Sequence, residues 1–169
     1  MPAALKTPEP LSVEDAWKIV ERLPDPEIPV LSLTDLGVIR HLERDGDRLV
    51  VGIAPTYSGC PATEVISDSV KKALLRAGAR DVRIEQVLSP PWSTDWISDE
   101  GREKLRDYGI APPPTASSSK RALTGAEPVA CPRCRSTQSI RVSEFGSTPC
   151  KASYKCGDCL EPFEYFKCL

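Results

Sequence analysis

The sequence predicts an α+β protein in two parts, a small α-β-β-α-β-α domain with its helices on one face of a short sheet and a cysteine-rich C-terminal β module. Three observations support this fold class. Hydrophobic residues follow helical and strand periods in turn over 1–111, Pro, Ser and Ala dominate 112–128, and six of the seven cysteines lie in the last 39 residues. We therefore expect a domain at 1–111, a flexible linker at 112–128 and a second module at 129–169.

The first helix and the turn after it follow from the residue pattern. Ser12 and Asp15 resemble a helix start, and the apolar residues that follow recur at helical spacing, which predicts a helix over 13–23. Three prolines within 24–29 then exclude helix and predict a rigid, extended turn.

Three runs of residues predict the strands of the first domain. Runs at 38–43 and 48–54 flank Asp45-Gly46, which is a strong hairpin signal. A third strand is expected over 81–88, where apolar and charged residues alternate until Pro90 and Pro91 end the pattern.

Two further helices complete the first domain. Cys60-Pro61 begins a helix with a buried apolar stripe, and Gly78 ends it. A short charged helix is expected around 99–108.

Cys60 is the candidate working thiol of the first domain. Because proline suits the first position of a helix, Cys60 is predicted to be the N-cap, where unpaired N–H groups favour the thiolate that attacks electrophiles or binds soft metals. Thr56 is placed to hydrogen-bond across the loop, and Asp25 and Glu27 lie on a proline-stiffened loop that could approach the same spot. The alternative is that Cys60 is a small buried hydrophobe.

Two C-x-x-C pairs predict a metal site in the C-terminal module. Cys131 and Cys134 are separated from Cys156 and Cys159 by 21 residues, close to the spacing of zinc ribbons with four thiolate ligands. A module of about 40 residues has too small a core to fold unaided, so the metal is expected to be structural. Its strands are predicted at 137–145, 152–155 and 161–167, with a turn at 146–149.

Other interpretations of the cysteines stay open. Four thiolates could hold an iron-sulfur cluster instead of zinc. Cys150 and Cys168 are left over, and they could pack as hydrophobes, replace one of the four ligands or form a redox pair.

Composition excludes several classes of function. With 22 basic and 24 acidic residues the chain lacks the strong positive charge typical of nucleic-acid-binding domains. It has no apolar run near the ~18 residues of a membrane span and no secretory signal, so we expect a cytoplasmic protein without a membrane partner. A single histidine, His41, rules out the usual di-iron and metalloprotease ligand sets and leaves Cys60 without an evident general base.

Particular motifs in both modules resemble known proteins. The first domain contains the run from Asp25-Pro-Glu to Asp35-Leu-Gly37, Thr56 with Cys60-Pro61, and Ser89-Pro-Pro-Trp92. With these motifs it resembles the iron-sulfur cluster assembly domain of bacterial SufT-type proteins and the eukaryotic cytosolic iron-sulfur targeting factor. The second module contains Cys131-Pro-x-Cys134, Gly146-Ser-Thr-x-Cys150-Lys, Tyr154-Lys-Cys156-x-x-Cys159 and Glu161-Pro-Phe-Glu-Tyr-Phe-Lys-Cys168. With these motifs it resembles the D subunit of bacterial phenylacetyl-CoA epoxidase.

This resemblance implies an accessory, non-enzymatic role in aerobic phenylacetate degradation. It implies assistance in assembling or maintaining an iron-sulfur cluster, with the other epoxidase subunits and above all the iron-sulfur flavin reductase as partners. By position, Cys60 would be a transient ligand of iron or of a cluster, with Asp25, Glu27 and Thr56 shaping the site. An adaptor role without cluster transfer is the alternative, and a homodimer stays open.

Overall fold

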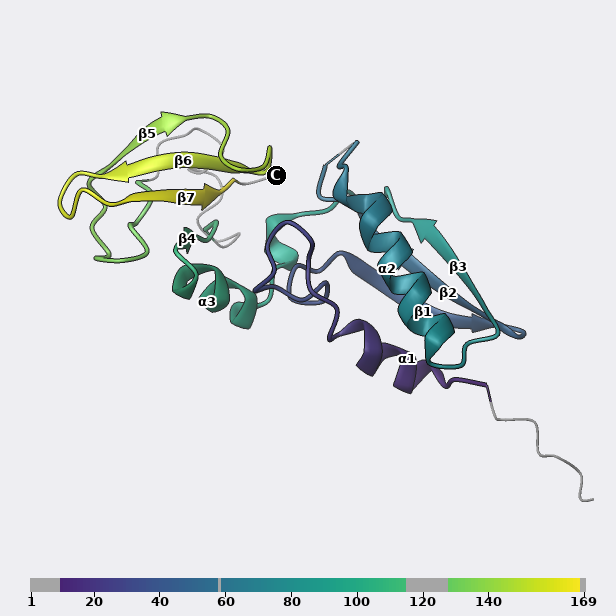
Figure 1. The fold of residues 1–169 in the computed structure, drawn as a ribbon. Helices are drawn as coiled ribbons and strands as arrows, with labels where there is room; N and C mark the ends of the chain where they lie inside the picture. The colour runs from purple at the N-terminus through teal and green to yellow at the C-terminus, as the bar shows by residue number, and fades with distance from the viewer. Residues whose placement is uncertain (1–9, 58, 115–127, 168–169) are drawn as a thin grey trace, which may run out of the picture.

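The computed structural model describes residues 10–57, 59–114 and 128–167. Within these ranges the chain forms two β-sheets that lie at opposite ends of the molecule, with helices and loops between them (Figure 1). Cys168 and most of the predicted linker lie outside the described residues. In the part of the chain that is described, no helix is long and apolar enough to cross a bilayer.

Helix α1 (Val13–Val20) begins where the sequence predicted. The Ser12 hydroxyl accepts a hydrogen bond from the Asp15 N–H at 3.0 Å, which caps the helix, and the Ala16 and Val20 side chains are buried. The helix ends three residues before the predicted position, because the chain tightens into i→i+3 turns ahead of Pro24.

The first sheet has the order β1-β2-β3, formed by β1 (Ile39–Asp45), β2 (Arg48–Ile53) and β3 (Asp81–Gln86). β1 and β2 form the predicted antiparallel hairpin, and Gly46 supplies the positive φ of 59° in its turn. β3 is parallel to β2, and helix α2 (Ala62–Arg76) makes the crossover between them.

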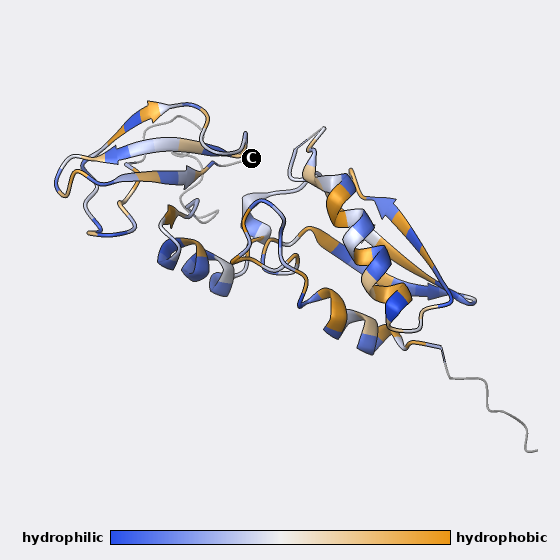
Figure 2. Ribbon diagram, viewed as in Figure 1, coloured by the Kyte–Doolittle hydropathy of each residue, from blue (hydrophilic) through white to orange (hydrophobic). Residues whose placement is uncertain are grey.

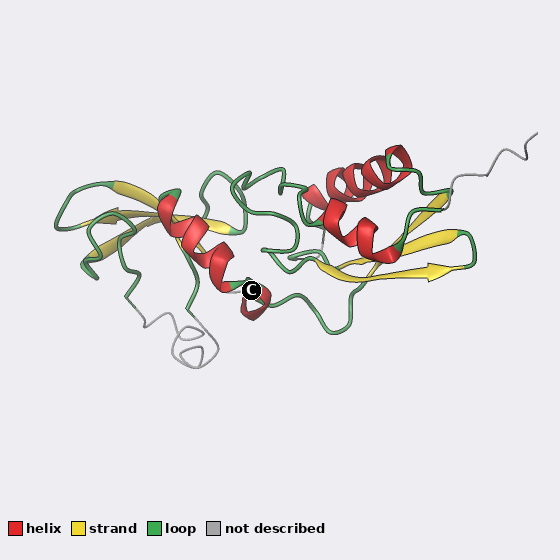
Figure 3. Cartoon of the chain, turned by 90° about the horizontal axis from the view of Figure 1, so that it is seen from below, coloured by secondary structure: helices red, strands yellow, loops and turns green. Residues whose placement is uncertain are grey.

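Helices α1 and α2 cover one face of this sheet, as predicted (Figure 3). Their apolar sides and the strands enclose the main core, which includes Val20, Val51, Val70 and Leu74. On β1, the imidazole of His41 lies against Gly52 of β2, where any added Cβ would come within 2.1 Å of the ring. The histidine ring therefore occupies the space that a side chain at position 52 would need.

The second sheet has the order β4-β7-β6-β5. Three strands come from the C-terminal module, namely β5 (Ser139–Ser143), β6 (Lys151–Cys156) and β7 (Pro162–Phe166). The fourth, β4 (Ile110–Ala111), precedes the predicted linker and pairs in parallel with β7. The chain thus enters the ribbon sheet before the linker begins.

Helix α3 (Asp99–Asp107) lies between the two sheets rather than against the first. It follows a short 3₁₀ helix, η1 (Thr94–Trp96), and packs beside β4 (Figure 1). Figure 2 shows that α3 is almost entirely hydrophilic, and Leu105 is its fully buried apolar side chain.

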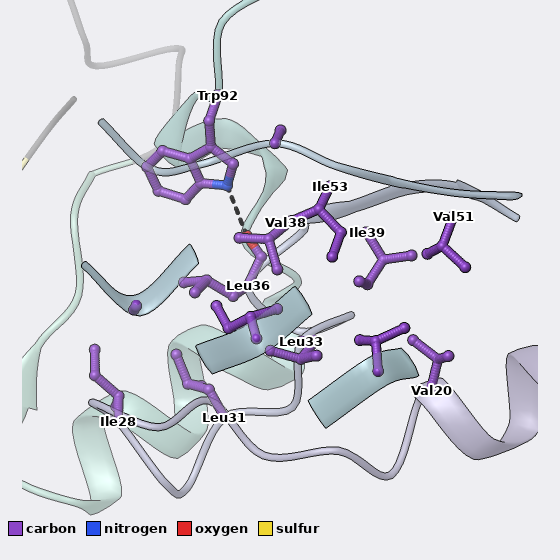
Figure 4. Close-up of a cluster of buried hydrophobic side chains, with 14 of the residues drawn as sticks. Val20, Ile28, Leu31, Leu33, Leu36, Val38, Ile39, Val51, Ile53 and Trp92 are labelled. Carbon is purple, nitrogen blue, oxygen red and sulfur yellow. Dashed lines mark hydrogen bonds between the residues drawn. The ribbon is translucent and has the colours of Figure 1, made fainter. Parts of the chain in front are cut away.

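The ribbon packs directly on the first domain. Cys150 and Phe166 of the ribbon belong to the same buried cluster as the core of the first domain. The Phe166 ring meets the Trp92 ring at a centroid distance of 6.1 Å, and the Trp92 indole donates to the carbonyl of Leu36 at 3.0 Å (Figure 4). Trp92 therefore joins the ribbon to the loop that follows α1.

Asp35 holds that loop against α3. Its carboxylate accepts from the Ser32 N–H at 3.0 Å and from the Ser98 hydroxyl at 3.1 Å, and it pairs with the Lys104 ammonium at 2.8 Å. Burial raises the pKa of Asp35, but these donors outweigh burial and hold the pKa below its usual value.

We expect Asp35→Asn to lower the free energy of unfolding at pH 7 by about 1–3 kcal/mol, because charge-assisted hydrogen bonds to a buried carboxylate are lost. Because the pKa of Asp35 is lower in the folded state, it stabilises the protein at pH values above the ordinary Asp pKa of about 3.9. This stabilisation is lost as the pH falls through the pKa that Asp35 has in the folded state. Urea unfolding should therefore show a gap between wild type and variant that narrows towards pH 3. The exposed change Asp95→Asn is the control, and equal losses for both variants would contradict this role of Asp35.

Candidate functional site

A small cavity lies where the first domain meets the ribbon. Its volume is about 20 Å³, which is room for one water molecule or ion. All four residues that the sequence predicted for the first-domain site line it, and Cys150 of the ribbon lines it as well. The larger apolar side chains of the wall are Ile28, Leu36, Val38, Ile53, Ile66 and Phe166.

Cys60 is half-buried just before α2. The Thr56 hydroxyl lies 3.8 Å from the Cys60 sulfur and donates to it, as predicted. The predicted N-cap role is wrong, because the helix begins at Ala62 and Pro61 is its N-cap, with helical φ and ψ of −66° and −24°. The Cys60 carbonyl, not its sulfur, accepts from the Thr63 N–H at 3.1 Å.

Asp25 shapes the proline-rich loop. It is buried, and one carboxylate oxygen accepts from the N–H groups of Glu27 at 2.9 Å and Ile28 at 2.8 Å. Burial raises the pKa of Asp25 against the effect of these two N–H donors. Asp25 therefore directs the next residues of the loop towards the cavity.

Glu27 is the half-buried acid of this loop. Within the described residues its carboxylate has no hydrogen bond or ion pair. Burial raises its pKa, the charge of Asp25 raises it further, and the ammonium of Lys151 opposes both. A carboxylate in this position is available to a cation in the cavity.

Two further residues, one next to the cavity and one lining it, interact with the predicted site residues. The Tyr57 hydroxyl is buried without a partner of standard hydrogen-bond geometry in the described part of the chain. Burial, followed by the charges of Cys60, Glu27 and Cys150, raises the pKa of Tyr57 to about 12. Tyr57 could have been predicted from the sequence, because it lies between Thr56 and Cys60 on the same loop.

Cys150 is the second missed participant, since sequence left its role open. It is 4% exposed, and the Thr148 hydroxyl lies 3.0 Å from its sulfur. Burial raises the pKa of the Cys150 thiol against the effect of Thr148, and the charge of Glu27 raises it further. The sequence indicates that Cys150 has another role, because the two C-x-x-C pairs already supply the four ligands of a zinc site.

The four cysteines of the C-x-x-C pairs do come together in the ribbon. Their sulfurs all lie within 4.8 Å of one another, with Cys131 and Cys159 at 3.8 Å and Cys134 and Cys156 at 3.5 Å. Four sulfurs held at ~2.3 Å from a tetrahedral zinc ion are separated by about 3.8 Å, so the set fits such an ion.

The backbone around each pair has a matching shape. Arg135 follows the first pair at φ 64° and Leu160 follows the second at φ 63°, and both φ values are unusual for residues with a Cβ. The N–H groups of Cys159 and Asp158 lower the pKa of Cys156 to about 7. The turn at each C-x-x-C pair thus directs its two sulfurs towards those of the other pair, and the four together form a group that fits a metal ion.

His41 does not belong to either site. It lies on β1, with its ring nitrogen 3.8 Å from a carboxylate oxygen of Glu85, and it is not among the residues that line the cavity.

Comparison with known protein families agrees with this two-part arrangement. Residues 14–86 match the family described as iron-sulfur cluster assembly protein, and residues 115–167 match the PaaD zinc beta ribbon domain.

Solved structures resemble the first domain. A domain of unknown function, DUF59, from Bacillus anthracis gives a TM-score of 0.51 at 25% identity and covers 55% of this chain and 90% of that one. A conserved hypothetical protein from Thermotoga maritima gives a TM-score of 0.50 at 25% identity, and the match covers 59% of this chain and 98% of that one.

Two curated proteins are similar in sequence. The Fe-S protein maturation auxiliary factor YitW of Bacillus subtilis (strain 168) is 33% identical over 87 residues, which are 50% of this chain and 84% of YitW. A protein of Escherichia coli (strain K12), named as the D subunit of 1,2-phenylacetyl-CoA epoxidase, is 47% identical over 165 residues, 98% of each chain. Because this second match spans both modules, the chain belongs to the family of the 1,2-phenylacetyl-CoA epoxidase D subunit.

Proposed function

We propose that this protein is an accessory maturation factor in phenylacetate catabolism, which helps to assemble or maintain an iron-sulfur cluster in the reductase component of the epoxidase. The observation that carries the proposal is the cavity that brings Cys60 together with Thr56 and Glu27. The name of YitW and the assembly-domain match support it.

In this proposal the Cys60 sulfur binds iron as its cargo. Thiolate is the soft ligand that iron-sulfur chemistry requires, and the Glu27 carboxylate offers an oxygen ligand without breaking any hydrogen bond within the described residues. Asp25 holds the loop, and the Thr56 hydroxyl orients the sulfur. The role is non-enzymatic and cytoplasmic, with transfer to the client occurring through protein contact.

Zinc is the metal that we propose for the ribbon. When bound, zinc cross-links the two C-x-x-C turns and does not act on a substrate. Its ligands are Cys131, Cys134, Cys156 and Cys159.

We expect Cys60→Ala to lower cluster occupancy of the co-produced reductase about tenfold or more, since even groups that only orient a metal ligand have effects of that size. Iron and sulfide analysis of the purified reductase measures it, with growth on phenylacetate as a second readout. Ser69→Ala, an exposed change on α2, is the matched control. Full occupancy with Cys60→Ala would remove the proposal.

Metal analysis should find one zinc ion per chain in colourless protein. Cys134→Ser should lose the ion and unfold the ribbon, because structural zinc contributes on the order of 10 kcal/mol to such modules. Circular dichroism during chelator titration follows the loss. Iron, acid-labile sulfide and visible colour in place of zinc would show that the four thiolates hold a cluster.

The adaptor alternative has one specific observation in its favour. Strand β5 is the outer strand of the ribbon sheet, and Ile140 and Val142 project from it with 68% and 67% exposure. If docking through this strand were the whole function, the double change I140E/V142E should abolish co-purification with the other epoxidase subunits while Cys60→Ala has no effect. Val65→Glu, at an exposed apolar position on α2, is the control.

A further inference from the structure

A large cleft lies on one face of the ribbon sheet and shares no lining residue with the Cys60 cavity. Its volume is about 930 Å³, and α3, which packs beside β4, forms part of its wall (Figure 1). Ala111 of β4, Tyr165 of β7 and Ala152 of β6 are cross-strand partners in one row, so they lie on the same face, and all three line the cleft. Arg141 of β5 lines it as well, next to its partner Tyr154 on β6. The cleft therefore spans the whole width of the sheet.

The side chains that line this cleft are strongly basic. Glu144 is the single acid among the described residues of the lining, and it pairs with Arg141 at 2.7 Å and with Lys167 at 3.9 Å. One carboxylate thus serves two cations. Three further cations line the cleft without an acid partner among the described residues, namely Arg102, Arg106 and Arg135.

These three arginines differ in their surroundings. Arg102 is buried, and its guanidinium donates to the carbonyl of Pro113 and, at 2.7 Å, to that of Thr94. Its charge is therefore hydrogen-bonded but not neutralised. The guanidinium groups of Arg106, which is half-buried, and Arg135, which is exposed, have no hydrogen bond or ion pair within the described residues. A concave surface with charges of one sign concentrates the field and attracts ligands of the opposite sign.

The spacing of the cations indicates an extended ligand. Arg106 lies on α3 beside β4, whereas Arg141 lies on β5 at the opposite edge of the sheet. Neighbouring strands are about 4.8 Å apart, so the outer strands of this sheet are separated by about 14 Å. Roughly four or five residues of extended chain cover that distance, whereas a single phosphate group does not. Carboxylates along such a chain match the fork of donors that each arginine presents.

We propose that this cleft is the docking site for an acidic, extended segment of a partner protein, whose Asp and Glu side chains pair with Arg106, Arg135 and Arg141. Charge complementarity carries the inference, and the net negative charge of the whole chain favours a peptide over a nucleic acid. The site goes beyond the proposed function, because it does not depend on iron binding at Cys60. It also differs from the exposed apolar surface of β5, since Ile140 and Val142 do not line the cleft.

The test uses the full, zinc-loaded chain and a fluorescent peptide of six glutamates, with binding followed by fluorescence anisotropy. The acidic peptide should bind at low salt and dissociate as NaCl is raised, because salt screens exposed charges. Peptides of six lysines, or of glycine and serine alone, should not bind.

Two single changes at the cleft should each weaken binding of the acidic peptide roughly tenfold, because hydrogen bonds between charged groups are lost. Arg106→Gln keeps a good helix former on α3, and Arg135→Asn suits the φ of 64° at that position. Arg133→Gln is the matched control, since Arg133 is exposed, lies two residues from Arg135 and does not line the cleft. Zinc content should stay at the wild-type value in all three variants, which shows that the ribbon is folded.

Four results would overturn the inference. Absence of binding by the acidic peptide at low salt would remove the site, and wild-type affinity in the double variant R106Q/R135N would place binding elsewhere. Tighter binding of a six-nucleotide single-stranded DNA than of the acidic peptide would assign the cleft to nucleic acid. Binding that appears only after residues 115–127 are replaced by a Gly-Ser segment of equal length would assign the cleft to the chain's own segment.

Discussion

The contact between Trp92 and Phe166 determines where the ribbon lies on the first domain. Trp92 is anchored through its indole to the Leu36 carbonyl, so the ring that receives Phe166 is fixed by the loop that follows α1. The same loop carries Asp25 and Glu27. Together with the pairing of β4 and β7, this aromatic contact therefore fixes the acidic loop and the ribbon relative to each other. The cavity is a consequence of this packing and does not belong to either module alone.

The acidic residues of the loop have different tasks, and their hydrogen bonds separate them. The carboxylates of Asp25 and Asp35 accept from backbone and side-chain donors, and in doing so hold the loop in shape. Glu27 has no such contact among the described residues. The half-buried charge of Glu27 carries a desolvation cost, which the nearby charge of Asp25 increases and the ammonium of Lys151 opposes.

Sequence reasoning predicted what depends on local pattern. The hairpin at Asp45-Gly46, the helices and the C-x-x-C metal group are set by neighbouring residues, and all are present in the structure. The N-cap assignment of Cys60 was wrong by one residue, an error typical of helix ends. The positions of Cys150 and Tyr57 depend on how the two modules pack, which no spacing encodes. The functional roles of Cys60 and its neighbours remain predictions.

The parallel pairing of β4 with β7 changes what the segment between the modules has to do. Because β4 precedes this segment and already lies in the ribbon sheet, the sheet itself holds the two parts in register. Where the two ends of a flexible segment are already held together, doubling its length costs only about 0.6 kcal/mol. A change in the length of this segment should therefore cost the protein little stability, because the pairing of β4 with β7 does not depend on it.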